Sequence, residues 1–179
     1  GCSAVADSVF LARGKTVTSA SGVTTVPSLE HLEGKTVAVL VDGGAHPDCV
    51  VTGGKITLQR PGKVINVGLR YLAELETNDI EAGAALGTAQ SAKKRLISVT
   101  PRVLNSSGGR LGPNRSRMQQ MFARRAHDRM DEAPPLFSGD LPLSWPSTNE
   151  AAGRIVLQHD EPLPFTLLGL VGVVETTDK

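Results

Sequence analysis

The sequence predicts a mainly β protein, a sandwich or a barrel-like set of antiparallel sheets with long excursions and at most short helices. One observation supports this fold class, and a second indicates how its core is built. Short β-branched and apolar runs recur along the 179 residues, and Gly- and Pro-rich turns separate them. Aromatic residues make up only 3% of the chain, so the core must be built from Val, Leu, Ile and Ala. A chain of this length can form one core of ordinary size or two small ones.

The clearest strand is expected at 34–42, where a β-branched run stops at an Asp-Gly-Gly turn. A hairpin follows, with strands at 49–52 and 55–58 around a Gly-Gly pair that tolerates positive φ. The Arg-Pro-Gly sequence at 60–62 predicts another turn, and the Val/Ile-rich segment 63–69 predicts a further strand.

The middle of the chain is less regular. We expect 71–80 to be extended and 81–92, rich in Ala and Gly, to contain a short helix. The segment 95–105 predicts a strand closed by a Ser-Ser-Gly-Gly turn, and Pro101 within it favours an edge position or a bulge. Residues 5–11 also have the pattern of an apolar strand, and the missing initiator Met leads us to expect a longer polypeptide.

The composition changes after residue 109. Six arginines and few periodic apolar residues predict an exposed excursion over 110–135. Strands are expected at 140–145 and 154–159, and the last, at 165–175, should be buried on both faces or against a partner chain. We therefore divide the chain into a β-rich core module (1–109), the excursion (110–135) and C-terminal strands (136–179) that complete the same sheet system.

The sequence contains no motif that predicts catalysis, a cofactor or a metal site. No glycine-rich phosphate-binding fingerprint and no nucleophile elbow occurs. The four histidines have no metal-ligand spacing and are expected in surface positions or turns: His31, His46, His127 and His159. Cys2 and Cys49 form no paired motif, which favours a reduced place of synthesis such as a cytoplasm. No apolar run approaches the length of about 18 residues that crosses a bilayer.

Two basic segments are candidate contact sites. Lys93, Lys94 and Arg95 precede a predicted strand and could meet phosphate or an acidic patch on a neighbouring subunit, although a solvated strand end is the simpler interpretation. The arginines of 110–129 allow the same two interpretations, and neighbouring carboxylates partly neutralise them. The net charge of +1 provides no global field that would attract nucleic acid or anionic lipid.

A series of short phrases resembles a known family. The phrases occur in order: LEHLEGKTV at 29–37, VTGGKITL at 51–58, VINVGLRY at 64–71, LET at 75–77, GTAQ at 87–90, KKRL at 93–96 and PLFSGD at 135–140. They resemble the phage tail nozzle and stabilisation proteins, a family that includes tail tubular protein B and the packaged-DNA stabilisation protein of short-tailed phages. Arg70 departs from the pattern, because the family usually has proline there.

The resemblance implies a virion structural protein of the phage tail, without catalysis or cofactor. Such proteins form rings, commonly hexameric, around the channel through which DNA leaves. The implied partners are further copies of the chain, neighbouring tail proteins and packaged DNA, with Lys93, Lys94 and Arg95 as lumen or interface contacts. Two other classes stay open: a tail appendage that binds a receptor or polysaccharide, with Tyr71 and Trp145 as its aromatic candidates, and a cell-wall hydrolase.

Overall fold

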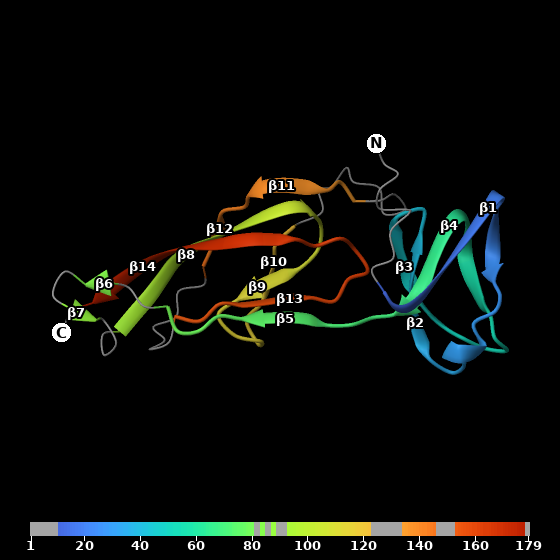
Figure 1. The fold of residues 1–179 in the computed structure, drawn as a ribbon, viewed down its shortest axis with the longest axis horizontal. Helices are drawn as coiled ribbons and strands as arrows, with labels where there is room; N and C mark the ends of the chain where they lie inside the picture. Colours follow the sequence, from blue (N-terminus) through green and yellow to red (C-terminus); the bar gives the residue numbers. More distant parts are fainter. Residues whose placement is uncertain are drawn as a thin grey trace. The chain divides into compact units, whose positions relative to one another are not determined.

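A computed structural model describes residues 11–80, 83–84, 87–88, 93–122, 134–145 and 153–177, with the backbone alone at 83–84, 87–88, 93–95 and 176–177. Strands dominate this part of the chain, and every pairing between them is antiparallel (Figure 1). The prediction of a mainly β protein is confirmed. The one helix described is the 3₁₀ turn η1 (Glu30–Leu32), and no described helix is long and apolar enough to span a bilayer.

The described residues form two compact units. Unit 1 contains 11–71, 134–135 and 160–164, and unit 2 contains most of the remainder. The division falls after Tyr71, inside the predicted core module 1–109, and the strands after residue 136 join unit 2 alone. The C-terminal strands therefore complete the sheets of unit 2, because their partners begin only after Tyr71.

Unit 1 is built on one four-stranded sheet in the order β1-β4-β2-β3. Its strands are β1 (Ala12–Val26), β2 (Thr36–Val41), β3 (Gly44–Val50) and β4 (Ile56–Leu69). The strand predicted at 34–42 is confirmed as β2. Its apolar run is almost entirely buried, and strands pair with it on both sides.

Two turn predictions in unit 1 have different outcomes. At 53–54 the turn is confirmed, since both glycines have positive φ (62° and 67°) and Thr52 bridges to Lys55. The turn predicted at 60–62 is wrong, because β4 continues through it. The ladder with β1 is irregular beside these residues, so Pro61 is accommodated where regular pairing is interrupted.

The core of unit 1 is aliphatic, as the composition predicts. Eleven buried residues contact one another in it: Val26, Leu29, Leu32, Val37, Val39, Val41, Val51, Ile56, Leu58, Ile65 and Val67.

Unit 2 contains two four-stranded sheets and a small hairpin. The first sheet has the order β10-β9-β13-β5, formed by β10 (Gln119–Gln120), β9 (Arg110–Gly112), β13 (Val156–His159) and β5 (Ala73–Glu76). The second has β8 (Lys93–Ser106) at its centre, with β11 (Phe137–Asp140) and β12 (Leu143–Ser144) on one side and β14 (Leu167–Thr177) on the other. Strands β6 (Gly83–Ala84) and β7 (Gly87–Thr88) form the hairpin.

Several expectations for unit 2 change. The extended conformation of 71–80 is confirmed by β5, but the short helix expected within 81–92 is wrong for the residues described there, which form β6 and β7. Glycines at both short strands weaken any helix. The excursion predicted at 110–135 begins instead with β9 and β10, and Leu111 (0% exposed) and Met121 (3% exposed) belong to the core. Residues 123–133 lie outside the described part of the chain.

Pro101 lies inside a central strand, so of the two alternatives predicted for it, an edge position or a bulge, the edge position is wrong. Its carbonyl accepts a hydrogen bond from the Leu141 amide (3.0 Å), at the gap between β11 and β12. Within a strand, the N–H and C=O of one residue point to the same side. The donor that proline lacks therefore faces a break in the ladder, where no regular partner is lost.

The core of unit 2 lies between its sheets. Eight buried residues form it: Leu96, Val99, Val103, Leu111, Met121, Trp145, Ile155 and Leu157. Strand β14 contributes one face to this core and leaves its other face exposed. Of the two alternatives expected for it, burial on both faces within the chain is wrong, and burial against a partner chain stays a prediction.

Candidate interaction surface

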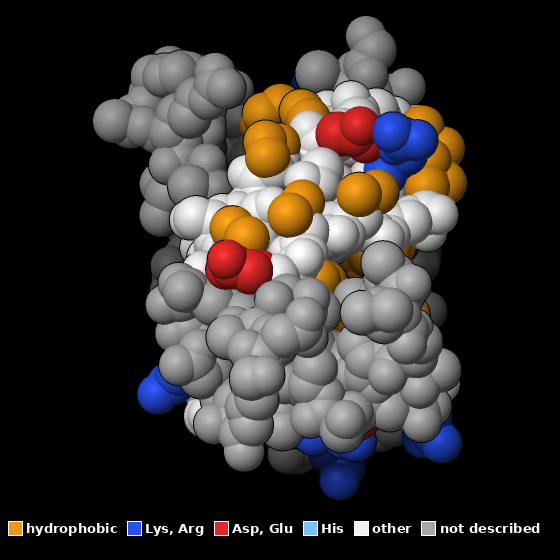
Figure 2. All heavy atoms as spheres, turned by 90° about the vertical axis from the view of Figure 1, so that its left-hand side faces the viewer, with side chains coloured by type: hydrophobic (Ala, Val, Ile, Leu, Met, Phe, Trp, Pro, Cys, Tyr) orange, Lys and Arg blue, Asp and Glu red, His pale blue; other side chains and the backbone are white. Residues whose placement is uncertain are grey.

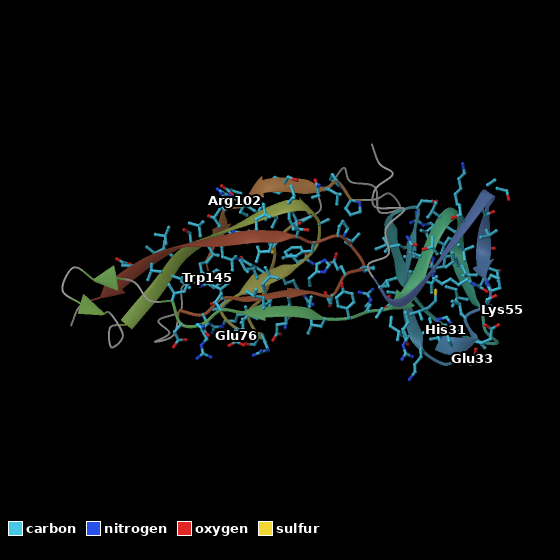
Figure 3. The ribbon with its side chains drawn as sticks, in the orientation of Figure 1. His31, Glu33, Lys55, Glu76, Arg102 and Trp145 are labelled. Carbon is cyan, nitrogen blue, oxygen red and sulfur yellow. The ribbon has the colours of Figure 1, made fainter. Side chains whose placement is uncertain are left out.

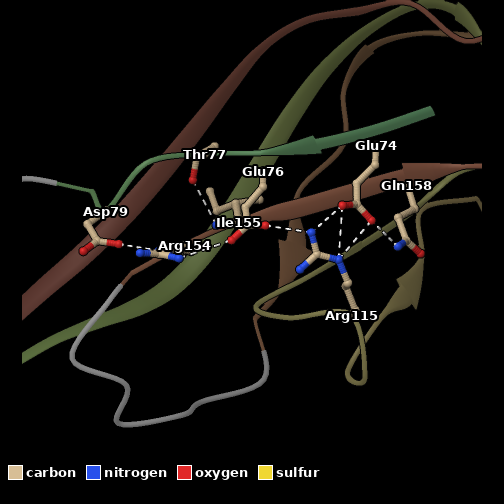
Figure 4. A network of polar contacts seen from close by, with 8 residues as sticks. All are labelled: Glu74, Glu76, Thr77, Asp79, Arg115, Arg154, Ile155 and Gln158. Atoms are coloured by element: carbon tan, nitrogen blue, oxygen red, sulfur yellow. Dashed lines mark hydrogen bonds and ion pairs between the residues drawn. The ribbon is translucent and has the colours of Figure 1, made fainter. Parts of the chain in front are cut away.

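A network of charged side chains covers the outer side of β5 and its neighbours in unit 2 (Figure 4). Arg115, in the loop after β9, places Nη2 2.5 Å from Glu74 Oε1 and 2.9 Å from Glu76 Oε2. Arg154, just before β13, binds Asp79 (Nε to Oδ1, 2.6 Å) and also Glu76 (Nη1 to Oε1, 3.3 Å). Three carboxylates and two guanidinium groups thus form one continuous chain of contacts.

The network is largely neutralised from within. The Arg115 hydrogen bond, then that of Gln158, holds the pKa of Glu74 below its ordinary value, while partial burial opposes them. Arg115 and Arg154 in turn have raised pKa values because they bind these carboxylates. The carboxylates are engaged by arginine, and no three His, Cys, Asp or Glu side chains in the described ranges are grouped as a metal site would require. The network stabilises the junction of β5, β9 and β13.

A second surface is apolar. Five exposed side chains lie on β14 and β8, and we call them the outer strip: Leu168, Val171, Val173, Ile97 and Leu104. Val171 and Val173 stand two residues apart in β14, so their side chains share one face of the sheet. They are 59% and 52% exposed. Figure 2 looks onto the end of unit 2 where β8 begins and β14 ends, and hydrophobic side chains gather over the described part of that face.

Polar groups border the outer strip. Arg102 of β8 binds Asp140 of β11 through two short contacts, Nε to Oδ1 at 2.6 Å and Nη2 to Oδ2 at 2.8 Å. Arg102 stands opposite Gly169 of β14, and Figure 3 shows it pointing away from the unit 2 core. An exposed apolar surface with a polar border is typical of a protein contact site.

The long edge of β14 is also open. The strand pairs with β8 from Leu167 to Thr177, and no other described strand pairs with it. From Phe165 to Val174 the sequence carries no charge. Charged residues and prolines are the usual protection of an edge strand against other chains, and this stretch contains neither.

The predicted contact residues Lys93, Lys94 and Arg95 begin β8. Their backbone stands opposite Thr177, Thr176 and Glu175 of β14, respectively, and their side chains lie outside the described part of the structure. The backbone thus brings them to the end of the ribbon where Ile97 and Val173 lie, whereas Leu104 and Leu168 lie toward its other end. The network around Glu76 belongs to the other sheet of unit 2.

The described histidines and Cys49 belong to no group of side chains that could hold a metal ion. His46 is buried, its Nε2 accepts a hydrogen bond from the Gln59 amide (3.1 Å), and its Nδ1 lies 2.8 Å from the Pro47 carbonyl oxygen. His159 is also buried, where it stacks on Phe165 with 5.0 Å between ring centroids. The expectation of surface or turn positions is therefore wrong for these two, and His127 lies outside the described residues. Burial, then nearby Asp48, raises the pKa of the Cys49 thiol, which disfavours the reactive thiolate.

The aromatic residues considered for ligand binding lie in different environments. Trp145 is 8% exposed and belongs to the unit 2 core (Figure 3). Tyr71 is 52% exposed. A stacking platform for a sugar needs accessible rings, and Trp145 cannot supply one.

The outer strip and the charged network were both missed by the sequence reasoning. Glu74 and Glu76 stand at the two-residue spacing of a strand, which signals one charged face, but their arginine partners come from segments about 40 and 80 residues away. For β14 the signal was present as an uncharged apolar segment. That signal does not distinguish a strand covered on both faces from one that is exposed on one of them.

The comparisons with known proteins add no family. No protein-family model matches the sequence, and no curated protein matches it.

Proposed function

We propose that this chain is a structural subunit of a bacteriophage tail, a nozzle or hub component that assembles into a homo-oligomeric ring, commonly of six copies, around the DNA exit channel. The ordered phrases from residue 29 to residue 140 support the family. Its place is then the virion, its partners are copies of itself and adjacent tail proteins, and it acts without catalysis or cofactor.

The observation that supports the assembly part of this proposal is the outer strip. Its valines and leucines remain more than two fifths exposed in a single copy, on a strand ribbon that is otherwise well packed. Apolar area of this kind is stabilised when another surface covers it, at about 25 cal/mol for each Å² removed from water. A ring buries such a surface between neighbouring copies.

The β architecture suits a channel wall. Antiparallel ladders hold the backbone of both units, and the two aliphatic cores pack behind them. Such a wall resists deformation, because changing the register of one strand moves its buried side chains to the wrong face. A subunit of this type retains packaged DNA by geometry and requires no sequence-specific contact.

Electron microscopy of the purified chain tests the ring. We expect particles with a central channel and a uniform number of subunits. Particles without a channel, together with binding to host polysaccharide, would instead favour the receptor- or polysaccharide-binding appendage.

The role of Lys93, Lys94 and Arg95 is tested separately. Changing all three to Ala should weaken ring assembly or the retention of packaged DNA, because lumen or interface contacts would lose three positive charges. Changing Arg110 and Arg117 to Ala provides a basic control elsewhere in unit 2. If the triple variant assembles and retains DNA as the parent does, these residues are solvated strand ends.

A further inference from the structure

We propose that the free chain forms a two-fold dimer in which β14 pairs antiparallel with β14 of a second copy, with the symmetry axis at Gly172. The proposal goes beyond the ring. A two-fold contact joins copies in pairs and does not close a ring of cyclic symmetry, so either arrangement can exist without the other.

The open edge determines what kind of occupant fits. Beyond its pairing with β8, β14 presents a row of backbone N–H and C=O groups, and these are satisfied best by another extended strand. The ladder between β14 and β8 has two irregularities: Leu168 is an extra residue in β14, and Ile97 is an extra residue in β8. From Gly169 to Thr177, β14 contains no extra residue. The partner must therefore be a strand of about nine residues with apolar side chains on both faces.

Other described edges of the chain do not meet these conditions. Strand β1 inserts extra residues between Thr18 and Val23, and β3 contains Pro47 and Asp48. Strand β5 is four residues long and carries glutamates already bound to Arg115, while β10, β11 and β12 have four residues or fewer. Among the described strands, β14 is the one that can serve as its own partner.

The apolar positions support this register. An axis at Gly172 places Val171 of each copy opposite Val173 of the other, twice, on the face of the outer strip. On the inner face, Leu170 stands opposite Val174, and both already pack partly against the core of unit 2. Directly opposed apolar side chains are the pairs that stabilise antiparallel sheets.

Glu175, the one charged residue among the described side chains of β14, distinguishes this register from registers with the axis one residue away. With the axis at Gly172, Glu175 stands opposite Gly169, where a side-chain carbon built on the glycine meets no atom within 4 Å. The carboxylate can therefore reach water. An axis at Val171 would place Glu175 opposite Leu167, and an axis at Val173 would place it opposite Val171, so each would set a charge against an apolar side chain.

The size of the contact predicts its strength. With the axis at Gly172, the seven residues 169–175 pair and extend about 24 Å, and a sheet layer is about 10 Å thick, so each copy buries about 240 Å². Stable interfaces bury about 800 Å² on each partner. The dimer should therefore dissociate on dilution.

Charge substitutions test the register. In the register proposed, Val171→Lys with Val173→Lys sets lysine against lysine twice, whereas Val171→Lys with Val173→Glu sets lysine against glutamate twice. We expect the first pair of changes to raise the dimer dissociation constant about tenfold or more and the second to leave it within about threefold of the parent. Analytical ultracentrifugation over a concentration series measures both. Both positions are exposed, so unfolding midpoints should stay close to that of the parent.

Cysteine cross-linking locates the axis. In a background with Cys2→Ser and Cys49→Ser, Gly172→Cys should give a disulfide-linked dimer under mild oxidation, because paired α-carbons in a sheet lie about 4.5–5.5 Å apart. A side-chain carbon added there meets Leu96 Cδ2 at 3.2 Å and Ile80 Cδ1 at 4.0 Å, and both are ends of side chains that can move. Gly169→Cys is the control, since the two copies of that residue would be about 20 Å apart.

Three results would overturn the dimer. The first is a parent chain that stays monomeric at all concentrations, and the second is an equal response of the two charge variants. The third is equal cross-linking of Gly172→Cys and Gly169→Cys. A chain that forms only dimers would support this inference and contradict the ring, whereas rings insensitive to both charge variants would support the ring and contradict this inference.

Discussion

Single side chains of unit 1 hold turns by binding backbone amides. Glu33 follows the 3₁₀ turn, and its carboxylate accepts hydrogen bonds from the amides of Gly53 (2.8 Å) and Gly54 (2.6 Å), both of which have positive φ. Successive amides in this conformation form a small anion-binding concavity. Here the chain fills it with its own carboxylate and thereby joins two turns that are 20 residues apart.

Removing this carboxylate should loosen the turn. We expect Glu33→Gln to lower the free energy of unfolding by about 1 kcal/mol, because a charge-assisted contact with two amides becomes a neutral one. Glu30→Gln, which leaves both Glu33 bonds in place, is the matched control. Urea unfolding of the two variants and the parent makes the comparison, and equal midpoints for Glu33→Gln and the parent would show that solvent replaces the contact without cost.

The imidazole of His46 has a comparable role in the interior. It connects the Gln59 amide with the Pro47 carbonyl, and the two contacts assign the proton to Nδ1. His46→Leu removes both contacts and should cost about 1–3 kcal/mol of stability. His31→Leu, at an exposed position of η1, should cost far less, and thermal unfolding of both variants tests the difference.

Among the strands, β5 has exposed side chains, and ion pairs with two arginines connect it to its neighbours. Its four residues are all exposed, and the arginines of two other segments secure it through Glu74, Glu76 and Asp79. Exposed ion pairs contribute little singly, but a shared network restrains several side chains at once. The pairing of β5 with β13 should therefore depend on pH and salt.

The sign of the pH effect follows from Glu74. Arg115 holds its pKa below the ordinary value of 4.5, so the folded state binds fewer protons than the unfolded state as the pH falls through that value. The stability that this pair contributes is present above pH 4.5 and is lost as the pH falls through the lowered folded pKa. Arg115→Gln should remove part of the pH dependence in that acidic window, measured as urea midpoints against pH. Arg117→Gln, in the same loop, should preserve it.

Strand β9 tolerates no side chain at Gly112. A carbon atom added there would collide with the Arg117 carbonyl oxygen, which is backbone and cannot rotate away. Gly112→Ala should therefore cost about 1–3 kcal/mol of stability. Gly169→Ala in β14 is the control, because the same atom there meets nothing within 4 Å. Similar midpoints for both variants at low protein concentration would show that the β9 loop moves freely.

The elements also show how far the sequence predicts the fold. Strand β2 is predicted well, because its continuous run of β-branched and apolar residues favours a buried strand. The turn predicted from Pro61 and the edge position predicted from Pro101 were wrong, because each proline lies where a ladder is interrupted and its missing N–H costs no regular hydrogen bond. The exposure of the outer strip was not predictable, because it depends on which strands fail to cover β14.

For the whole molecule, the proposed function depends on association between copies of the chain. The chain divides into two units with separate cores, and in neither unit are three described His, Cys, Asp or Glu side chains grouped to hold a metal ion. The remaining prominent feature is the open β14 edge with its outer strip. Both the proposed ring and the proposed dimer require contact between copies, and both predict that the chain does not remain a monomer at high concentration.

The native mass of the purified chain, measured by multi-angle light scattering over a concentration series, tests this central claim most directly. The proposed dimer and ring predict that the measured mass rises with concentration, from that of one and two chains to about six times the 18.8 kDa of one chain. A constant mass of one chain up to the highest concentration would contradict it.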